Sequence, residues 1–262
     1  MSYLVNMKNI NKNFRIAKDI LVSILGRIGT TSLSMAETDS DKILYASQGI
    51  HLRKYEEDFR FVPGMITSTE SELLLYISTF CELKGDVIEI GSWLRKSTIS
   101  LAKGCMLTNN GIVHAIDTFK GNPGKEELSL KPLEADETIF ERFFKNLRAM
   151  RVEEYVKPYQ MSSNEARSLI NVPARLIFID GCHDYEAVKE DILLWKDLLL
   201  PNGYLLLHDF REDAPGVIQA VKECILHSED FDCLLLVDSL LAIQKVWGGV
   251  KNGKQSKILD CM

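Results

Sequence analysis

Four carboxylate side chains lie at or beside the ends of apolar segments that are typical of buried β-strands. They are Glu89 in DVIEI, Asp117 in GIVHAID, Asp180 in ARLIFID and Asp209 in YLLLHDF. Charged residues are excluded from the interior of a parallel sheet, whereas ligands bind at the carboxyl ends of its strands. A single acid of this kind is equally well explained as an Asx turn or a helix cap. Four in succession favour a binding site.

The first two acids predict a cofactor that contains adenosine. In the segment EIGS at 89–92, Gly91 would let the backbone of a strand-to-helix turn approach a ligand closely. Asp117, at the next strand end, can accept hydrogen bonds from both ribose hydroxyls. A dinucleotide would need a GxGxxG turn for its pyrophosphate, but residues 93–95 are Trp-Leu-Arg. The sequence therefore favours a cofactor that has no pyrophosphate.

Strand and helix patterns alternate regularly from residue 68 onward. Strands are predicted at 86–90, 111–117, 155–159, 174–180, 204–210, 231–237 and 240–246, and helices at 68–80, 97–107, 137–150, 185–199 and 215–227. Repeated β-α-β units predict an α/β fold whose parallel sheet has right-handed crossovers. Because Pro158 has no backbone N–H, the third strand should lie at an edge of the sheet or end there. Trp195 and His114 are expected in the core.

Three stretches resemble one known family. VIEIGSWLRKST, HAIDTF and LIFIDGCHDYEAVKEDILLWKDLLLPNGYLLLHDF are similar to class I S-adenosylmethionine-dependent methyltransferases. The likeness covers about residues 62–246 and is greatest to the branch of macrocin-type sugar O-methyltransferases and cephalosporin-hydroxylase-like proteins. It implies a Rossmann-like fold with a mainly parallel, seven-stranded sheet, helices on both faces and an N-terminal helical extension.

The resemblance also implies which residues bind S-adenosylmethionine. Glu89, Gly91 and Ser92 would surround its methionine part, and Asp117 would hold the ribose. Residues near the adenine and the acid of the D-G-x-H motif complete the expected set, namely Ser162, Ser163 and Asp180. One departure concerns Arg95, which stands where the family usually has a third glycine.

A metal and a general base are implied in the same way. Asp180 and Asp209 would bind a divalent metal and His183 would be the general base, so that His183 and Asp180 are the expected catalytic residues. His208 replaces a second acid and is a third candidate ligand, which would favour a transition metal over magnesium. Alternatively, His208 points into the sheet, because adjacent strand residues face opposite ways. His183 could also be a surface histidine without a role.

The bulk composition excludes several classes of protein. A net charge of -6 disfavours a non-specific nucleic-acid binder. No segment has the ~20 apolar residues of a membrane span and no secretory signal is apparent. The six cysteines include no CxxC pair and fit a reducing cytoplasm. The expected divisions are a helical cap or homo-oligomer contact at 1–61, the cofactor-binding domain at 62–248 and a tail at 249–262.

The favoured interpretation is an S-adenosylmethionine-dependent methyltransferase that methylates an oxygen of a small hydroxylated acceptor, with metal assistance as an open question. The loop at 118–134 is expected to lie over the ligand crevice, as a lid or as a plain solvated loop. Two other interpretations stay open. One is a non-catalytic cofactor-binding protein, and the other, less favoured, is an NAD-dependent oxidoreductase.

Overall fold

The structure, a computed structural model, describes residues 64–93, 96–121, 137–226 and 228–246, with the backbone alone for residues 226 and 232–234. Several expectations lie outside the described residues. These are the cap or oligomer contact at 1–61, the tail at 249–262, the position of Arg95 and most of the loop at 118–134. None of the described helices is long and apolar enough to cross a membrane.

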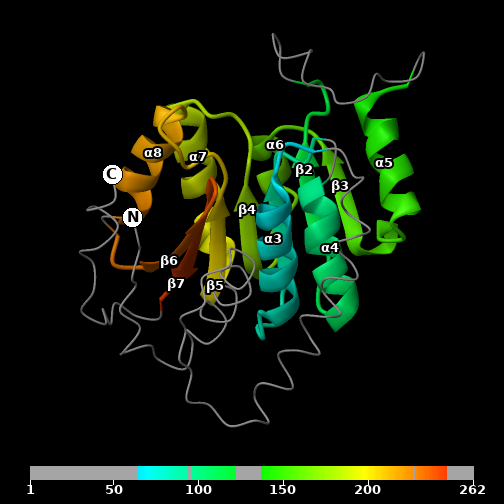
Figure 1. Cartoon of the computed structure of the whole chain (residues 1–262), viewed down its shortest axis with the longest axis horizontal. Helices are drawn as coiled ribbons and strands as arrows, with labels where there is room; N and C mark the ends of the chain where they lie inside the picture. Colours follow the sequence, from blue (N-terminus) through cyan, green and yellow to red (C-terminus); the bar gives the residue numbers. More distant parts are fainter. Residues whose placement is uncertain (1–63, 94–95, 122–136, 227, 247–262) are drawn as a thin grey trace, which may run out of the picture. The chain divides into compact units, whose positions relative to one another are not determined.

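A seven-stranded sheet in the order β3-β2-β1-β4-β5-β7-β6 organises the described chain (Figure 1). The strands are β1 Asp86–Ile90, β2 Val113–Asp117, β3 Val156–Gln160, β4 Ala174–Ile179, β5 Leu199–Leu207, β6 Phe231–Val237 and β7 Leu240–Lys245. The first five strands run parallel, whereas β7 pairs antiparallel with both β5 and β6. The predicted α/β class with a mainly parallel sheet is confirmed, and the order is that of the class I methyltransferase fold.

Helices cover both faces of this sheet. They are α3 Ser68–Phe80, α4 Lys96–Thr108, α5 Ile139–Ala149, α6 Ser163–Arg167, α7 Tyr185–Trp195 and α8 Pro215–Val221, the last continued by a π-helical turn at Lys222–Leu226. α3 packs along α4, and α7 packs along α8 (Figure 1). One apolar cluster joins β1, β4 and β5 to α7 and α8 through side chains such as Ile88, Ile177, Leu205, Ile192 and Val217.

The strand sequences explain the layering. All six residues of β4 are buried, as expected of a strand covered on both faces. Pro158 lies in β3, which is the edge strand next to β2, so the expected edge position is confirmed. Trp195 is fully buried and His114 is buried between the Tyr159 hydroxyl, 3.0 Å from Nδ1, and Asp86 Oδ2, 2.9 Å from Nε2. Both core predictions are therefore confirmed.

Three of the described helices begin with a capping box, in which a Thr or Ser side chain and a Glu side chain exchange hydrogen bonds with each other's backbone N–H. The pairs are Thr67 with Glu70 at α3, Thr138 with Glu141 at α5, and Ser162 with Glu165 at α6. The first of these boxes lies next to the functional residues described below.

Candidate active site at the strand ends

Glu89 is a buried acid with one oxygen satisfied and one not. Its Oε2 accepts hydrogen bonds from Ser92 Oγ at 2.9 Å and from Thr98 Oγ1 at 2.6 Å, at the start of α4. Its Oε1 is buried and has no hydrogen-bond partner among the described residues. Burial raises the pKa of Glu89 to about 7, because the hydroxyl hydrogen bonds offset only part of the desolvation. A ligand with an N–H or ammonium donor would supply the missing partner.

Gly91 lies where the first strand-to-helix turn touches the end of β4. Its φ is +87°, and a Cβ built there would lie 2.1 Å from the carbonyl oxygen of Asp180. The Asp180 N–H in turn donates to the Ile90 carbonyl at 2.8 Å. The close approach that Gly91 permits in the structure is therefore to the backbone of Asp180, which ties the two turns together.

Asp117, the last residue of β2, shapes the turns around it. Its Oδ2 accepts a hydrogen bond from the Trp93 N–H at 2.8 Å and its Oδ1 accepts one from the Phe119 N–H at 2.6 Å. Both donors have a left-handed backbone, with φ of 36° at Trp93 and 53° at Phe119. Each carboxylate oxygen has a second lone pair, so the carboxylate still has acceptor capacity for a ribose hydroxyl. We call Glu89 and Asp117 with these partners the β1–β2 rim.

The two serines after β3 have structural partners. Ser162 caps α6, and its N–H and hydroxyl both donate to Glu165. The Ser163 hydroxyl donates to Asp191 and accepts a hydrogen bond from Trp195 Nε1 at 2.8 Å, which joins α6 to α7. The serine hydroxyls thus serve helix capping and packing, and the contact of Ser162 and Ser163 with an adenine stays a prediction.

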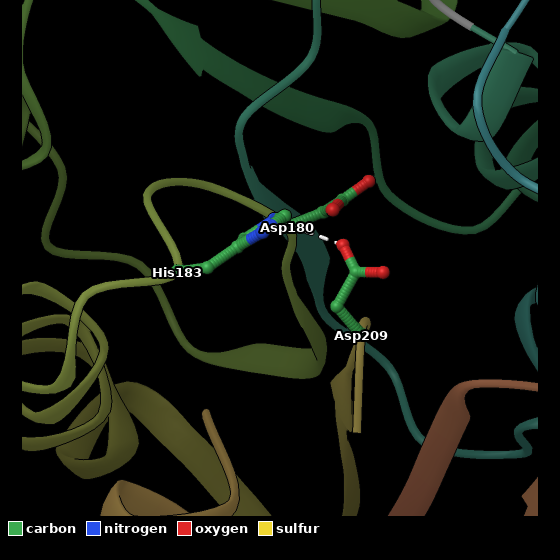
Figure 2. Close-up of side chains that lie close together, drawn as sticks. All are labelled: Asp180, His183 and Asp209. Atoms are coloured by element: carbon green, nitrogen blue, oxygen red, sulfur yellow. Dashed lines mark ion pairs between the residues drawn. The ribbon is translucent and has the colours of Figure 1, made fainter. Parts of the chain in front are cut away.

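At the ends of β4 and β5, three side chains converge (Figure 2). Asp180, His183 and Asp209 each offer a ligand atom, and these atoms lie within 4.8 Å of one another. His183 Nε2 donates to Asp209 Oδ2 at 2.8 Å, and Arg211 pairs with Asp209 Oδ1 at 2.8 Å. We call Asp180, His183, His208 and Asp209 the β4–β5 rim.

The buried imidazole of His208 contacts both Asp180 and Asp209. Its Nδ1 lies 3.1 Å from Asp180 Oδ1 and 3.2 Å from Asp209 Oδ2, and its ring packs edge-on to Phe178. Its exposed fraction is 7%, so the ring is buried, as the inward-pointing alternative expects. The three side chains whose possible ligand atoms converge are Asp180, His183 and Asp209, and the ligand role of His208 stays a prediction.

Charges at this rim are strongly coupled. Burial alone would lower the pKa of His208, but hydrogen bonds to Asp180, Asp209 and Glu70 raise it to about 12. Burial raises the pKa of Asp180, only partly countered by His208. For Asp209 burial acts in the same direction, yet the hydrogen bonds from His183 and His208 hold its pKa well below the usual range. His208 is therefore a cation at neutral pH and balances part of the charge of the acids.

Two residues that the sequence did not single out, Glu70 and Ser239, complete this network. Glu70 on α3 is fully buried and its Oε2 lies 3.2 Å from His208 Nε2, while its Oε1 accepts hydrogen bonds from the Ser239 N–H at 2.9 Å and hydroxyl at 2.8 Å. Burial opposes ionisation of Glu70, but hydrogen bonds from His208 and Thr67 lower its pKa to about 2. The only sequence signal was the capping-box pattern of Thr67 and Glu70, which predicts a local role.

Comparison with known proteins agrees with the fold. Residues 88–210 match a family described as "Methyltransferase domain", and this segment runs from within β1 to just beyond β5. No protein of curated function is similar enough in sequence to match the chain.

Solved structures with the same fold are distant in sequence. The O-methyltransferase NovP is 16% identical with a TM-score of 0.57, covering 70% of this chain and 82% of NovP. The Podospora anserina methyltransferase PaMTH1, solved with bound SAH, is 15% identical with a TM-score of 0.53, covering 83% of this chain and 100% of PaMTH1. The O-methyltransferase from Bacillus cereus, in complex with SAH, is 14% identical with a TM-score of 0.53, covering 88% of this chain and 100% of that one.

The nicotinamide alternative receives no support from these matches, and the branch within the methyltransferases is not distinguished by them. Together, the family match over residues 88–210 and the strand order indicate a methyltransferase domain with the class I fold.

Proposed function

We propose that the chain transfers a methyl group from S-adenosylmethionine to a hydroxyl oxygen of a small molecule. The observation that carries the proposal is the His183–Asp209 pair, 2.8 Å apart, beside Asp180 at the same edge of the sheet as Glu89 and Asp117. The names of two structural neighbours, NovP and the Bacillus cereus protein, as O-methyltransferases support oxygen as the acceptor atom.

The β1–β2 rim fits the cofactor. The unpartnered Oε1 of Glu89 would accept from the ammonium of the methionine part, and Asp117 would accept from the ribose hydroxyls. Gly91, Ser92 and Asp180 would line the methionine end, and the backbone at 162–163 would border the adenine. The cofactor supplies a methyl group on a sulfonium, which makes that carbon electrophilic.

The β4–β5 rim then acts on the acceptor. Methyl transfer is a direct displacement, so alignment of the acceptor oxygen with the methyl group contributes much of the rate. His183 would take the hydroxyl proton, and Asp209 orients the imidazole and stabilises the cation that forms. The 36% exposure of the His183 side chain suits a group that meets an acceptor arriving from solvent.

The same residues could instead bind a divalent metal, because their three possible ligand atoms lie within 4.8 Å of one another. The mixed nitrogen and oxygen donors of Asp180, His183 and Asp209 fit a transition metal better than magnesium. A metal held there would lower the pKa of the acceptor hydroxyl. In that case His208 would donate hydrogen bonds to Asp180 and Asp209 and would not bind the metal itself, which differs from the ligand role that the resemblance implied.

The test is a labelled-methyl assay on the full chain with phenolic and sugar-like hydroxyl acceptors. Transfer should occur with the parent and fall about 100-fold or more in His183→Gln, which is the usual contribution of a general base. Asp184→Asn is the matched control, because Asp184 lies on the same loop and makes no side-chain capping bond to α7.

The metal question is decided by repeating the assay after chelator treatment. Activity that is lost with chelator and restored by Mn²⁺ assigns the cluster to a metal, whereas unchanged activity assigns His183 and Asp209 to proton transfer alone. Tight SAH binding without transfer to any acceptor would instead indicate a non-catalytic cofactor-binding protein.

A further inference from the structure

We propose that Glu70 of α3 is a positioning residue for the β4–β5 rim, which acts through His208 on the carboxylates of Asp180 and Asp209. The functional consequence rests on the proposed methyl transfer, whereas the physical coupling does not. Glu70 and its partner Ser239 both lie outside the matched segment 88–210, so the proposal assigns part of the active-site architecture to segments outside that core.

The surroundings of Glu70 are built for a charged group. Four donors meet its carboxylate: the Thr67 N–H at 2.8 Å and His208 Nε2 at 3.2 Å on Oε2, and the Ser239 N–H at 2.9 Å and hydroxyl at 2.8 Å on Oε1. The residue is fully buried. An ionised carboxylate is tolerated in such a place only when its lone pairs are satisfied, so each of these contacts is needed.

Through His208, the position of Glu70 is transmitted to the strand ends. Carboxylates only accept hydrogen bonds, so the imidazole donates from Nε2 to Glu70 and from Nδ1 toward Asp180 and Asp209. A planar ring with both nitrogens engaged cannot rotate without losing a bond. Glu70 therefore fixes the ring plane, and the ring plane fixes the two carboxylates that flank His183.

The turn between β6 and β7 also contacts the start of α3 around Glu70. Thr67 Oγ1 donates to Asp238 Oδ2 at 2.6 Å, and Ser239 holds Glu70. The Phe210 N–H donates to the Ser239 carbonyl at 2.9 Å, directly after Asp209 in the chain. The start of α3, this turn and the end of β5 thus form one connected unit.

Helix capping alone does not explain this arrangement. Glu141 and Glu165 occupy the same capping-box position at α5 and α6, where they accept bonds from Thr138 and Ser162. Both of these glutamates are exposed at their helix starts, whereas Glu70 is fully buried. The chain thus contains its own matched controls for the loss of a capping carboxylate.

The experiment compares Glu70→Gln with Glu141→Gln in the full chain. Glutamine has one acceptor oxygen and one donor nitrogen, so it can still cap α3 but cannot accept from both His208 and Ser239. The readout is the ring-nitrogen NMR spectrum at one pH, which is tractable because the chain has five histidines. Single histidine substitutions assign the signals.

We expect Glu70→Gln to shift the ring signals of His208 and also those of His183, which Glu70 does not contact. Methyl transfer should fall about tenfold or more, because small misplacements at a reacting centre are costly. SAH affinity should stay within about threefold of the parent, since the β1–β2 rim is untouched. Glu141→Gln should match the parent in all three measurements.

Unchanged His183 and His208 spectra in a folded Glu70→Gln protein would overturn the proposal. If that variant does not fold, Ser239→Ala replaces it, because it removes a neutral hydroxyl from the same network, and unchanged spectra there have the same meaning. Failure of the parent to bind SAH or transfer methyl would reject the proposed function alone, because the spectra test the coupling independently.

Discussion

The two rims of the sheet hold their acids in opposite ways. At the β1–β2 rim, the partners of Glu89 and Asp117 are hydroxyls and backbone N–H groups between 2 and 24 positions away in the chain. At the β4–β5 rim, His208 reaches Glu70 across 138 positions, and Ser239 reaches Glu70 across 169. The first rim leaves a buried carboxyl oxygen without a partner among the described residues, whereas the second pairs its acids with the cations His208 and Arg211.

This difference suggests that the β1–β2 rim binds a ligand, whereas the β4–β5 rim orients a protein side chain. A buried acid with an unsatisfied oxygen and a pKa raised to about 7, such as Glu89, can ionise to receive a cationic group from a bound molecule. Acids that are already paired, such as Asp209, instead orient a protein group. Gly91 is the point at which the two rims touch, because its backbone packs against that of Asp180.

The largest effect should follow loss of the cation in the β4–β5 rim. His208→Leu leaves Glu70, Asp180 and Asp209 without a shared partner and should lower the free energy of unfolding by about 3–5 kcal/mol. His114→Leu, the control, removes a buried histidine that faces a single carboxylate, so it should cost only about 1–3 kcal/mol. Urea unfolding at pH 7 measures both, and equal losses would contradict the claim that His208 balances several buried acids at the β4–β5 rim.

The second-largest loss of stability should follow substitution of Gly91, whose backbone packs against that of Asp180 between the two rims. Gly91→Ala forces a Cβ into the Asp180 carbonyl group at a positive φ and should destabilise the fold by about 3 kcal/mol. Gly181→Ala serves as the control, because its nearest contact would be an ordinary 3.5 Å to Asp191. Similar denaturation midpoints for the two variants would show that the turns do not depend on this contact.

The sequence predicted the parts of this arrangement that depend on nearby residues. The helix at 68–80, the strand at 86–90 and the edge position of Pro158 follow from periodicity, capping and proline chemistry. The acids at the strand ends were also visible, because each closes an apolar run.

What the sequence could not show was which distant side chains meet those acids. The bounds of α3 were predicted, yet nothing in the segment STESELL distinguishes Glu70 from an exposed cap such as Glu141. Its burial against His208 and Ser239 exists only because α3 docks beside the ends of β5 and β7. That His183 joins Asp180 and Asp209 in the cluster of possible ligand atoms likewise depends on contacts between segments that are distant in the chain.

The β1–β2 rim should make stability depend on pH. Burial raises the pKa of Glu89 from 4.5 to about 7, so between these pH values the folded protein holds a proton that the unfolded chain has released. Stability from this group is present at pH 4.5 and is lost as the pH rises to about 7, by up to about 3 kcal/mol. Glu89→Gln should remove this slope. Parallel unfolding curves for parent and variant across that range would contradict the assignment, and the exposed Glu165→Gln is the control.

The smallest of these effects concerns cofactor affinity. Asp117→Asn removes the charge that would face the ribose and should weaken SAH binding by about 1–3 kcal/mol. Asp86→Asn is the matched control, because Asp86 lies at the opposite end of the neighbouring strand β1 and pairs with His114. Equal SAH affinities for the two variants would reject the ribose assignment of Asp117.

The most direct test of the account is calorimetric titration of the purified chain with SAH, with NAD titrated in parallel. Glu89 and Asp117 offer acceptors for an ammonium and a ribose, whereas the sequence at 93–95 lacks the glycines of a pyrophosphate turn. SAH should therefore bind with a dissociation constant on the order of a micromolar, and NAD should not bind. Binding of NAD in place of SAH, or of neither molecule, would contradict the assignment of this rim to S-adenosylmethionine.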